Sequence, residues 1–293
     1  MRYCLILILL IFYACNNEDS KPKPVANNVD TDFFKDGEVE TIFENNRDSG
    51  VNIVLLADGY TKRDLGKKFG NYPKDAKKFI DALFNTPPFA AYQKDFNMYV
   101  VYAESAKSKI SIGNPSQDNT AFGITIYNGQ YIYNRLKVEE YARKAIPNAR
   151  EVHLRLMLTN YGLNGRAFYG VIAIFDTTSE ITMLHEVGHA FGFLGEEYSN
   201  NWETSIGHPN IDSTNKLSMI KWSHFIGLPS YKIVGAYPGS NNLWIPEPYS
   251  IMGNDERGVA YNAPSREAIV KRIIKIKGAK YDFNVFLKKD VPN

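Results

Sequence analysis

Two histidines and a glutamate stand at a spacing that suits metal chemistry: His185, Glu186 and His189 form the pattern H-E-x-x-H. On a helix, residues i and i+4 lie on the same face, so both imidazoles can bind one metal ion. Zinc accepts such nitrogen ligands and, in catalytic sites, keeps one position open for water. Glu186 lies next to the first histidine and can act as a general base on that water. The pattern therefore predicts metal-assisted hydrolysis, most often of a peptide bond.

A helix must carry these residues, and the flanking sequence indicates its limits. Thr177 and Glu180 have the spacing of a capping box, which predicts a helix start. Gly192 and Gly195 predict its end, because glycine readily adopts the left-handed conformation found there. Apolar residues recur at helical spacing and form one face of this helix: Ile181, Leu184, Gly188 and Phe191.

A zinc site of this kind needs a third protein ligand, and acidic residues are available. Glu196 and Glu197 follow the predicted turn, where the chain can fold back toward the two histidines. Another reading takes the ligand from a separate helix, for instance Glu267. From the residues alone, these alternatives stay open.

Strands alternate with helices along the chain, which predicts a mixed α/β layer structure. Residues 161–170 contain three glycines and are expected to form a turn, and residues 199–249 are expected to be irregular, as a wall or lid of a cleft. Apolar runs predict strands at 51–56, 96–103, 152–159, 171–175 and 281–287, the run at 152–159 alternating as in a half-buried strand. Helical patterns begin at Thr61 and cover 73–83, 137–145 and 262–274.

Residues 1–15 have the layout of a secretory signal peptide. Arg2 precedes an apolar run that is too short for a comfortable membrane span. Residues 12–15, Phe-Tyr-Ala-Cys, resemble a bacterial lipoprotein cleavage box, so we expect Cys15 to become the lipidated N-terminus. The alternatives are an ordinary signal peptide and an uncleaved anchor. The expected location is the cell envelope or outer membrane, on the cell surface or the periplasmic side.

The remaining chain divides into two parts. Residues 16–48 are expected to form a polar tether and N-terminal segment, and residues 49–293 a catalytic domain. The two cysteines, Cys4 and Cys15, both lie within residues 1–15. The catalytic domain therefore has no disulfide to form, and its stability depends on core packing. The formal net charge of +2 at pH 7 argues against a nucleic-acid partner. We expect a monomer that acts on a protein or peptide.

Four patches of the sequence resemble the IgA peptidase family of zinc metalloproteases, a branch of the metzincin clan. They are residues 54–61 (VLLADGYT), 185–198 (HEVGHAFGFLGEEY), 250–252 (SIM) and 261–269 (YNAPSREAI). The resemblance implies a two-lobed metzincin-like fold. The upper lobe would contain a twisted mixed sheet and the active-site helix, and the irregular lower lobe would contain the Met-turn around Met252 and a C-terminal helix.

By the same resemblance, His185, His189 and Glu196 are the Zn²⁺ ligands and Glu186 is the catalytic base. Substrate would lie in the cleft between the lobes, paired to the edge strand of the sheet. Two positions depart from the common metzincin pattern. Gly195 stands ten residues after the first histidine, where the third ligand is usual, and Asn254 replaces a tyrosine that some members place after the Met-turn.

Two questions remain open at this stage. The residue that stabilises the oxyanion is unassigned, with Tyr198 and Tyr261 as the candidates. A second class of function is a catalytically weak surface binding protein, for a glycan or a host protein, on a protease-like scaffold. Its aromatic surface could come from Trp202, Trp222 and Trp244. The intact metal pattern favours the enzyme, and zinc binding without cleavage would favour the binding protein.

Overall fold

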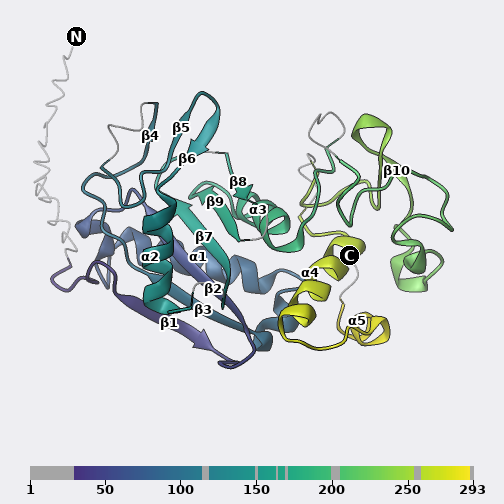
Figure 1. Cartoon of the computed structure of the whole chain (residues 1–293), viewed down its shortest axis with the longest axis horizontal. Helices are drawn as coiled ribbons and strands as arrows, with labels where there is room; N and C mark the ends of the chain where they lie inside the picture. The colour runs from purple at the N-terminus through teal and green to yellow at the C-terminus, as the bar shows by residue number, and fades with distance from the viewer. Residues whose placement is uncertain are drawn as a thin grey trace, which may run out of the picture.

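The computed structural model describes residues 30–113, 119–148, 151–162, 164–168, 171–198, 205–253 and 259–290 (Figure 1). The predicted signal peptide, Cys15 and the first part of the tether lie outside these ranges, as do Trp202 and Asn254. Among the described helices, none is long and apolar enough to cross a membrane.

A six-stranded mixed sheet forms the centre of one half of the molecule (Figure 1). Its strands are β1 (Val39–Glu44), β2 (Val51–Asp58), β3 (Phe96–Val101), β7 (Val152–Thr159), β8 (Arg166–Phe168) and β9 (Ile172–Asp176). They lie in the order β1-β3-β2-β7-β9-β8. The four inner strands are parallel to one another, and each edge strand is antiparallel to the inner strand beside it. The predicted mixed α/β class is confirmed. β1 lies within the residues expected to form the N-terminal segment.

Both faces of this sheet are covered, which explains the continuous apolar runs in its central strands. Every residue of β2 is buried. β7 is also buried along nearly its whole length, so the half-exposed alternation expected for residues 152–159 is wrong. The polar residues of this strand are largely buried and are paired with other polar groups. Arg155 pairs with Glu139 at 2.8 Å, and His153 Nδ1 accepts a hydrogen bond from the amide of Asn52 at 2.9 Å.

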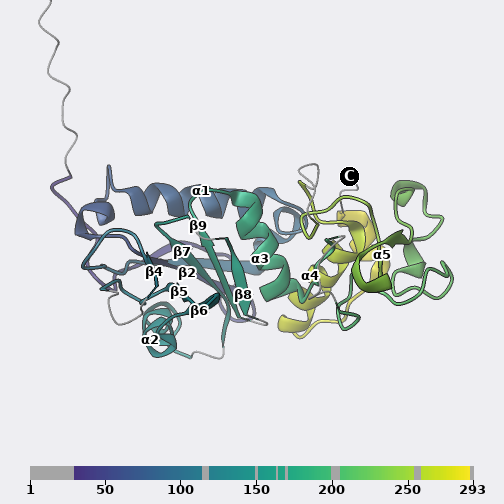
Figure 2. The same cartoon turned by 90° about the horizontal axis from the view of Figure 1, so that it is seen from above.

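Helices α1 (Asn71–Asn85) and α2 (Arg135–Ala145) lie on opposite faces of the sheet (Figure 2). One apolar core joins α1 and α3 (Glu180–Gly192) to alternate residues of β2, and a second core joins α2 to the residues between them. Because α3 directly follows β9, it emerges at the carboxyl end of the parallel strands. Ligand sites in open α/β sheets gather at that end.

A buried carboxylate organises the loops at the same end of β2. Asp58 accepts hydrogen bonds from the amides of Phe122 and Ile124 at 3.0 and 2.8 Å, and from the Thr120 hydroxyl at 3.0 Å. The chain turns directly after Asp58, where Gly59 has a φ of +80°. A small three-stranded sheet adjoins this loop and consists of β4 (Ser111–Ile112), β5 (Thr125–Tyr127) and β6 (Gln130–Ile132).

The turn expected for residues 161–170 contains an unpredicted strand. β8 pairs antiparallel with β9 and forms the edge of the sheet. A strand of three residues, preceded by Gly162 and Gly165, is too short to show an alternating pattern. This edge strand lies beside α3, so the sequence analysis missed an element that borders the candidate site (Figure 1).

The other half of the molecule is rich in loops, as expected for residues 199–249 in the part that is described. Its helices are α4 (Ala263–Ile276) and α5 (Phe283–Lys289), and its short strands are β10 (Tyr237–Pro238) and β11 (Trp244–Ile245). The strand expected at residues 281–287 is wrong, because α5 occupies most of it. The Asp282 side chain accepts a hydrogen bond from the Val285 amide at 3.0 Å and so caps a helix whose Phe286 is buried.

Candidate metal centre

Helix α3 begins two residues later than the capping box suggested. Ser179 is its N-cap residue, and the Ser179 hydroxyl accepts a hydrogen bond from the amide of Thr182 at 3.2 Å. The prediction that Thr177 caps the helix is therefore wrong, although Glu180 is the first helical residue. Both serine and threonine are good N-caps, so local sequence could not separate them.

The end of α3 also differs from the expectation. The left-handed residue after the helix is Phe193, with a φ of 55°, rather than a glycine. Gly195 is needed for space instead, because a Cβ atom on it would lie 2.7 Å from the His208 ring. The amide of Leu194 donates to the Gly188 carbonyl at 3.1 Å. The chain thus reverses tightly and returns along the helix.

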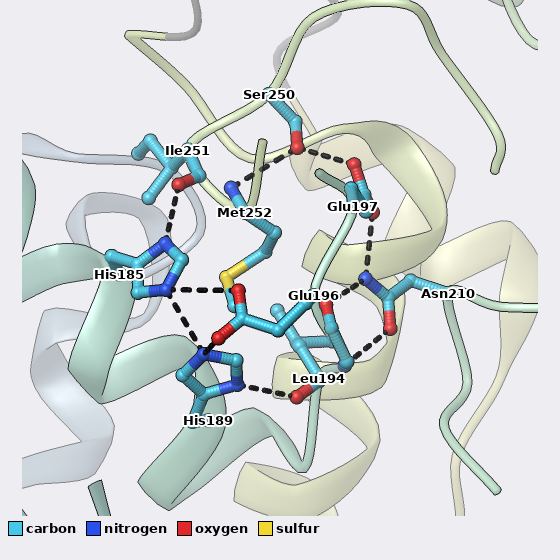
Figure 3. A network of polar contacts seen from close by, with 10 residues as sticks. His185, His189, Leu194, Glu196, Glu197, Asn210, Ser250, Ile251 and Met252 are labelled. Carbon is cyan, nitrogen blue, oxygen red and sulfur yellow. Dashed lines mark hydrogen bonds and ion pairs between the residues drawn. The ribbon is translucent and has the colours of Figure 1, made fainter. Parts of the chain in front are cut away.

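Three side chains converge where the chain returns (Figure 3). The Nε2 atoms of His185 and His189 are 3.0 Å apart. Glu196 reaches both rings, with Oε1 at 3.1 Å from Nε2 of His189 and Oε2 at 3.3 Å from Nε2 of His185. One ligand atom of each residue lies within 4.8 Å of the others. Among the described residues, this is the group of histidines and acids that could hold a metal ion.

The far nitrogen of each ring is held by a backbone carbonyl. Nδ1 of His185 donates to the Ile251 carbonyl at 2.8 Å, and Nδ1 of His189 donates to the Leu194 carbonyl at 2.7 Å. A carbonyl oxygen can only accept, so each Nδ1 carries a proton, and in the neutral form of each ring Nε2 directs a lone pair into the cluster. This is the arrangement in which metal-binding histidines are usually oriented.

Glu196 is charged in this setting. Burial alone would raise the pKa of its carboxyl group, but hydrogen bonds with His185 and His189 outweigh burial and lower the pKa to about 2. An ionised carboxylate and two imidazole lone pairs form a donor set that suits a divalent cation.

Residues 250–253 lie directly against the cluster from the loop-rich half. Ile251 supplies the carbonyl that holds His185. Met252 is fully buried under α3, where its sulfur would lie 2.5 Å from a Cβ atom on Gly188. Gly188 is therefore required by the close approach of this segment to the helix (Figure 3 shows the segment).

Glu197 points away from the cluster and is not a ligand. Its buried carboxylate accepts hydrogen bonds from the amides of Asn210 and Asn262, at 2.6 and 2.7 Å, and from the Ser250 hydroxyl. Burial raises the pKa of Glu197 to about 7, against the opposing effect of these hydrogen bonds. Adjacent side chains in an extended segment face opposite ways. Of Glu196 and Glu197, between which the sequence could not decide, only Glu196 therefore contacts the two histidines.

Glu267, the other alternative, lies on α4 with different partners. Its Oε1 accepts hydrogen bonds from Tyr281 at 2.8 Å and Lys271 at 2.9 Å, and lies 3.1 Å from Nε2 of His224. His224 thus contacts Glu267 away from the cluster, and His153 belongs to β7. The structure does not bring Glu267 to the cluster.

Glu186 lies on α3 beside the two histidines and is buried. Burial raises the pKa of its carboxyl group, and the nearby side chains of His185 and His189 only partly offset this rise. Gly165 covers it from the start of β8: a Cβ atom there would lie 2.6 Å from Oε1 of Glu186. A raised pKa and a fixed position suit a group that exchanges protons.

A cleft of about 460 Å³ opens above these residues. Arg166 and Ala167 of β8 form one wall, and Ile251 and Gly253 form the other. Tyr198 also lines the cleft, and its ring stacks on His185 with centroids 5.6 Å apart. Burial, with the charges of Glu196 and Glu186, raises the pKa of Tyr198 to about 12, so its hydroxyl keeps its proton.

Tyr261, the other candidate for the oxyanion, is unavailable. It is fully buried, and its hydroxyl donates to the Leu184 carbonyl behind the helix. The two tryptophans within the described residues offer little aromatic surface: Trp222 is buried and donates to the Gly235 carbonyl at 2.7 Å, and Trp244 is partly buried in β11.

Sequence reasoning missed the residues around Glu197. Asn210, Ser250 and Asn262 come from three separate segments, and no local pattern connects them. Asn262 had a signal of a different kind, since it stands before Ala-Pro at a predicted helix start. It does cap α4, accepting from the Ser265 amide at 3.0 Å, while its amide group donates to Glu197.

Fold and site together define a mixed α/β protein with a buried His/His/Glu group under a cleft. The family model described as IgA Peptidase M64 matches residues 43–231, and the chain belongs to this family of peptidases. The resemblance identified in the sequence is confirmed. The matched region includes α3 and Glu196 but ends before residues 250–252 and 261–269. A search of curated proteins found no match.

Proposed function

We propose that this protein is a zinc-dependent endopeptidase. The observation that carries the proposal is the convergence of three side chains: the Nε2 atoms of His185 and His189 are 3.0 Å apart, and the two carboxylate oxygens of Glu196 lie 3.1 Å from Nε2 of His189 and 3.3 Å from Nε2 of His185. Ligand atoms placed tetrahedrally at 2.0–2.1 Å from zinc are about 3.3 Å from one another. His185, His189 and Glu196 therefore fit a zinc ion with little movement, and the cleft leaves the fourth position accessible.

Zinc bound there would polarise the scissile carbonyl and make an attacking water more acidic. Glu186 accepts a proton from that water and returns it to the leaving amine, and its raised pKa suits both transfers. Tyr198 can donate a hydrogen bond from its hydroxyl to the carbonyl oxygen as negative charge develops there. Met252 and its neighbours act as the clan's Met-turn, a rigid floor beneath the ligands.

An extended peptide would bind along β8. This strand is an edge of the sheet, and its residues Arg166 and Ala167 line the cleft. Peptides commonly add to such an edge through backbone hydrogen bonds, with side-chain pockets giving specificity. The family's description does not identify immunoglobulin as the substrate of this chain, because specificity depends on cleft loops. For location, we propose display on the bacterial cell envelope through a lipidated Cys15.

The test combines metal content with turnover. Purified protein should contain one zinc per chain, cleave members of a broad peptide library, lose activity with a chelator and regain it with zinc. Glu186→Gln is the matched control, because it should keep the zinc and lose the activity. Zinc binding without cleavage of any peptide would favour the surface binding protein, and absence of zinc binding would refute the metal site.

A further inference from the structure

The carboxylate of Glu197 connects four segments of the chain without touching the metal-ligand group. Its side chain accepts from Asn210 at 2.6 Å, from Asn262 at 2.7 and 2.9 Å, and from the Ser250 hydroxyl. Its amide donates to the Met252 carbonyl at 2.8 Å. Each of these side-chain contacts brings a donor to an oxygen of the carboxyl group, so both oxygens of this buried group have partners.

Asn210 extends this connection to the backbone just before the third ligand. Its Oδ1 accepts from the Gly195 amide at 2.7 Å, and its Nδ2 donates to the Gly195 carbonyl at 2.9 Å. Residues on both sides of Glu196 are therefore held, Gly195 by Asn210 and Glu197 by the group around it (Figure 3). Glu196 has little freedom left except to face the two histidines.

The loop that carries Asn210 is held in turn by a lysine. Lys221 Nζ donates to the carbonyls of Ile206, His208 and Ile211, at 2.5, 2.7 and 2.5 Å. Asn210 lies among these carbonyls and is fully buried. The loop of residues 206–211 thus depends on a side chain that does not belong to the His/His/Glu cluster.

We propose that Glu197 and Asn210 are a positioning pair that fixes Glu196 for the metal, and that Lys221 sets metal affinity from a distance through the loop of residues 206–211. The proposal rests on the zinc site proposed above. Its physical basis is preorganisation: a ligand held in place before the metal arrives loses less freedom on binding. Loosening the pair leaves all three ligands present but lets Glu196 move.

The experiment measures zinc dissociation constants by competition with a chromophoric chelator. The variants are Glu197→Gln, Asn210→Ala and Lys221→Met, none of which removes a ligand. Glu197→Gln keeps the shape but turns one acceptor into a donor that faces existing donors. We expect zinc affinity to fall about 10–100-fold in the first two variants, as is usual for groups that orient metal ligands, and less in Lys221→Met. With saturating zinc, kcat should return to near the wild-type value.

The matched control is Asp58→Asn, which alters another buried carboxylate, one whose partners come from the loop of residues 120–124. It should lower the melting temperature and leave zinc affinity unchanged. Cobalt-substituted protein gives a second readout, because a displaced Glu196 should alter the visible d–d bands in the variants but not in the control. Folding is checked by circular dichroism, and Lys221→Met covers the case in which Glu197→Gln does not fold.

The outcomes separate the two proposals. Wild-type protein that binds zinc tightly, with variants weakened only as much as the control, would overturn the positioning role and leave the proposed function standing. Wild-type protein that binds no zinc would overturn both. Weakened affinity in folded Lys221→Met, with Asp58→Asn unchanged, would establish the distant connection.

Discussion

Gly165 lies against Glu186 so closely that a Cβ atom on Gly165 would be 2.6 Å from the Oε1 atom of Glu186. The two residues come from different elements, the approach to the edge strand β8 and the helix α3. Any side chain at position 165 must push the carboxylate away from its present place. The absence of a side chain at position 165 therefore allows the proposed general base, Glu186, to keep its position.

The first prediction concerns this contact. Gly165→Ala should lower kcat by about 10²-fold, because a shift of about 1 Å in a reacting group can cost that much. Zinc content and melting temperature should change little. Gly162→Ala is the control, since a Cβ atom there meets its nearest neighbours only at 4.0 Å. Equal activity of the two variants would show that Glu186 tolerates displacement.

The second prediction separates the base from the third ligand. Glu186→Gln should keep zinc and lose at least 10²–10⁴-fold in turnover, roughly the contribution of general acid–base catalysis. Glu196→Gln should lose zinc affinity by more than the roughly 10–100-fold typical of residues that only orient ligands. The measurements are zinc stoichiometry and peptide cleavage on the same preparations. Zinc retained by Glu196→Gln would place the third ligand elsewhere in the chain.

The third prediction compares the two tyrosines left open by the sequence. Tyr198→Phe should lower kcat by about 10²–10³-fold, the usual cost of removing one oxyanion donor, with KM and zinc affinity nearly unchanged. Tyr261→Phe removes a buried hydrogen bond to the Leu184 carbonyl and should cost about 1 kcal/mol of stability. Its kcat should stay near the wild-type value. The reverse pattern would assign the catalytic hydroxyl to Tyr261.

The fourth prediction concerns stability in acid. Burial would raise the pKa of Glu267, but hydrogen bonds from His224, Lys271 and Tyr281 outweigh burial, and the pKa lies below its ordinary value of 4.5. A carboxyl group with a lower pKa in the folded state contributes stability above the unfolded pKa and loses it as pH falls through the folded pKa. Wild-type protein should therefore lose more stability below pH 4.5 than Glu267→Gln. Melting curves of both proteins across this pH range provide the check. Parallel pH dependences of the two melting temperatures would contradict the prediction.

The fifth prediction concerns the N-terminus. Processing between Ala14 and Cys15 should leave an acylated cysteine on the native protein. Mass spectrometry of the N-terminal peptide measures this directly, and Cys15→Ser should release the protein from the membrane fraction. An unmodified N-terminus at another position would contradict lipid anchoring without affecting the enzymatic proposal.

Local patterns in the sequence predicted the elements whose chemistry repeats over many residues. The apolar run of β2 and the H-E-x-x-H helix were both recognised, because hydrophobic periodicity and helical spacing are properties of a single segment. The prediction failed where a strand was too short to show a pattern, and where one apolar pattern is compatible with both a strand and a helix. β8 has three residues, and the apolar residues of α5 were taken for a strand although Asp282 caps a helix.

The sequence by itself determined that His185 and His189 can share one metal and that Glu186 stands beside them, because four residues make about one helical turn whatever surrounds the helix. Only the tertiary structure decided between Glu196, Glu197 and Glu267. Glu196 meets the histidines because Asn210, Ser250 and Asn262 hold Glu197 on the opposite side of the chain. Those three partners come from segments that meet only after folding, so no local spacing could reveal which acid faces the two histidines.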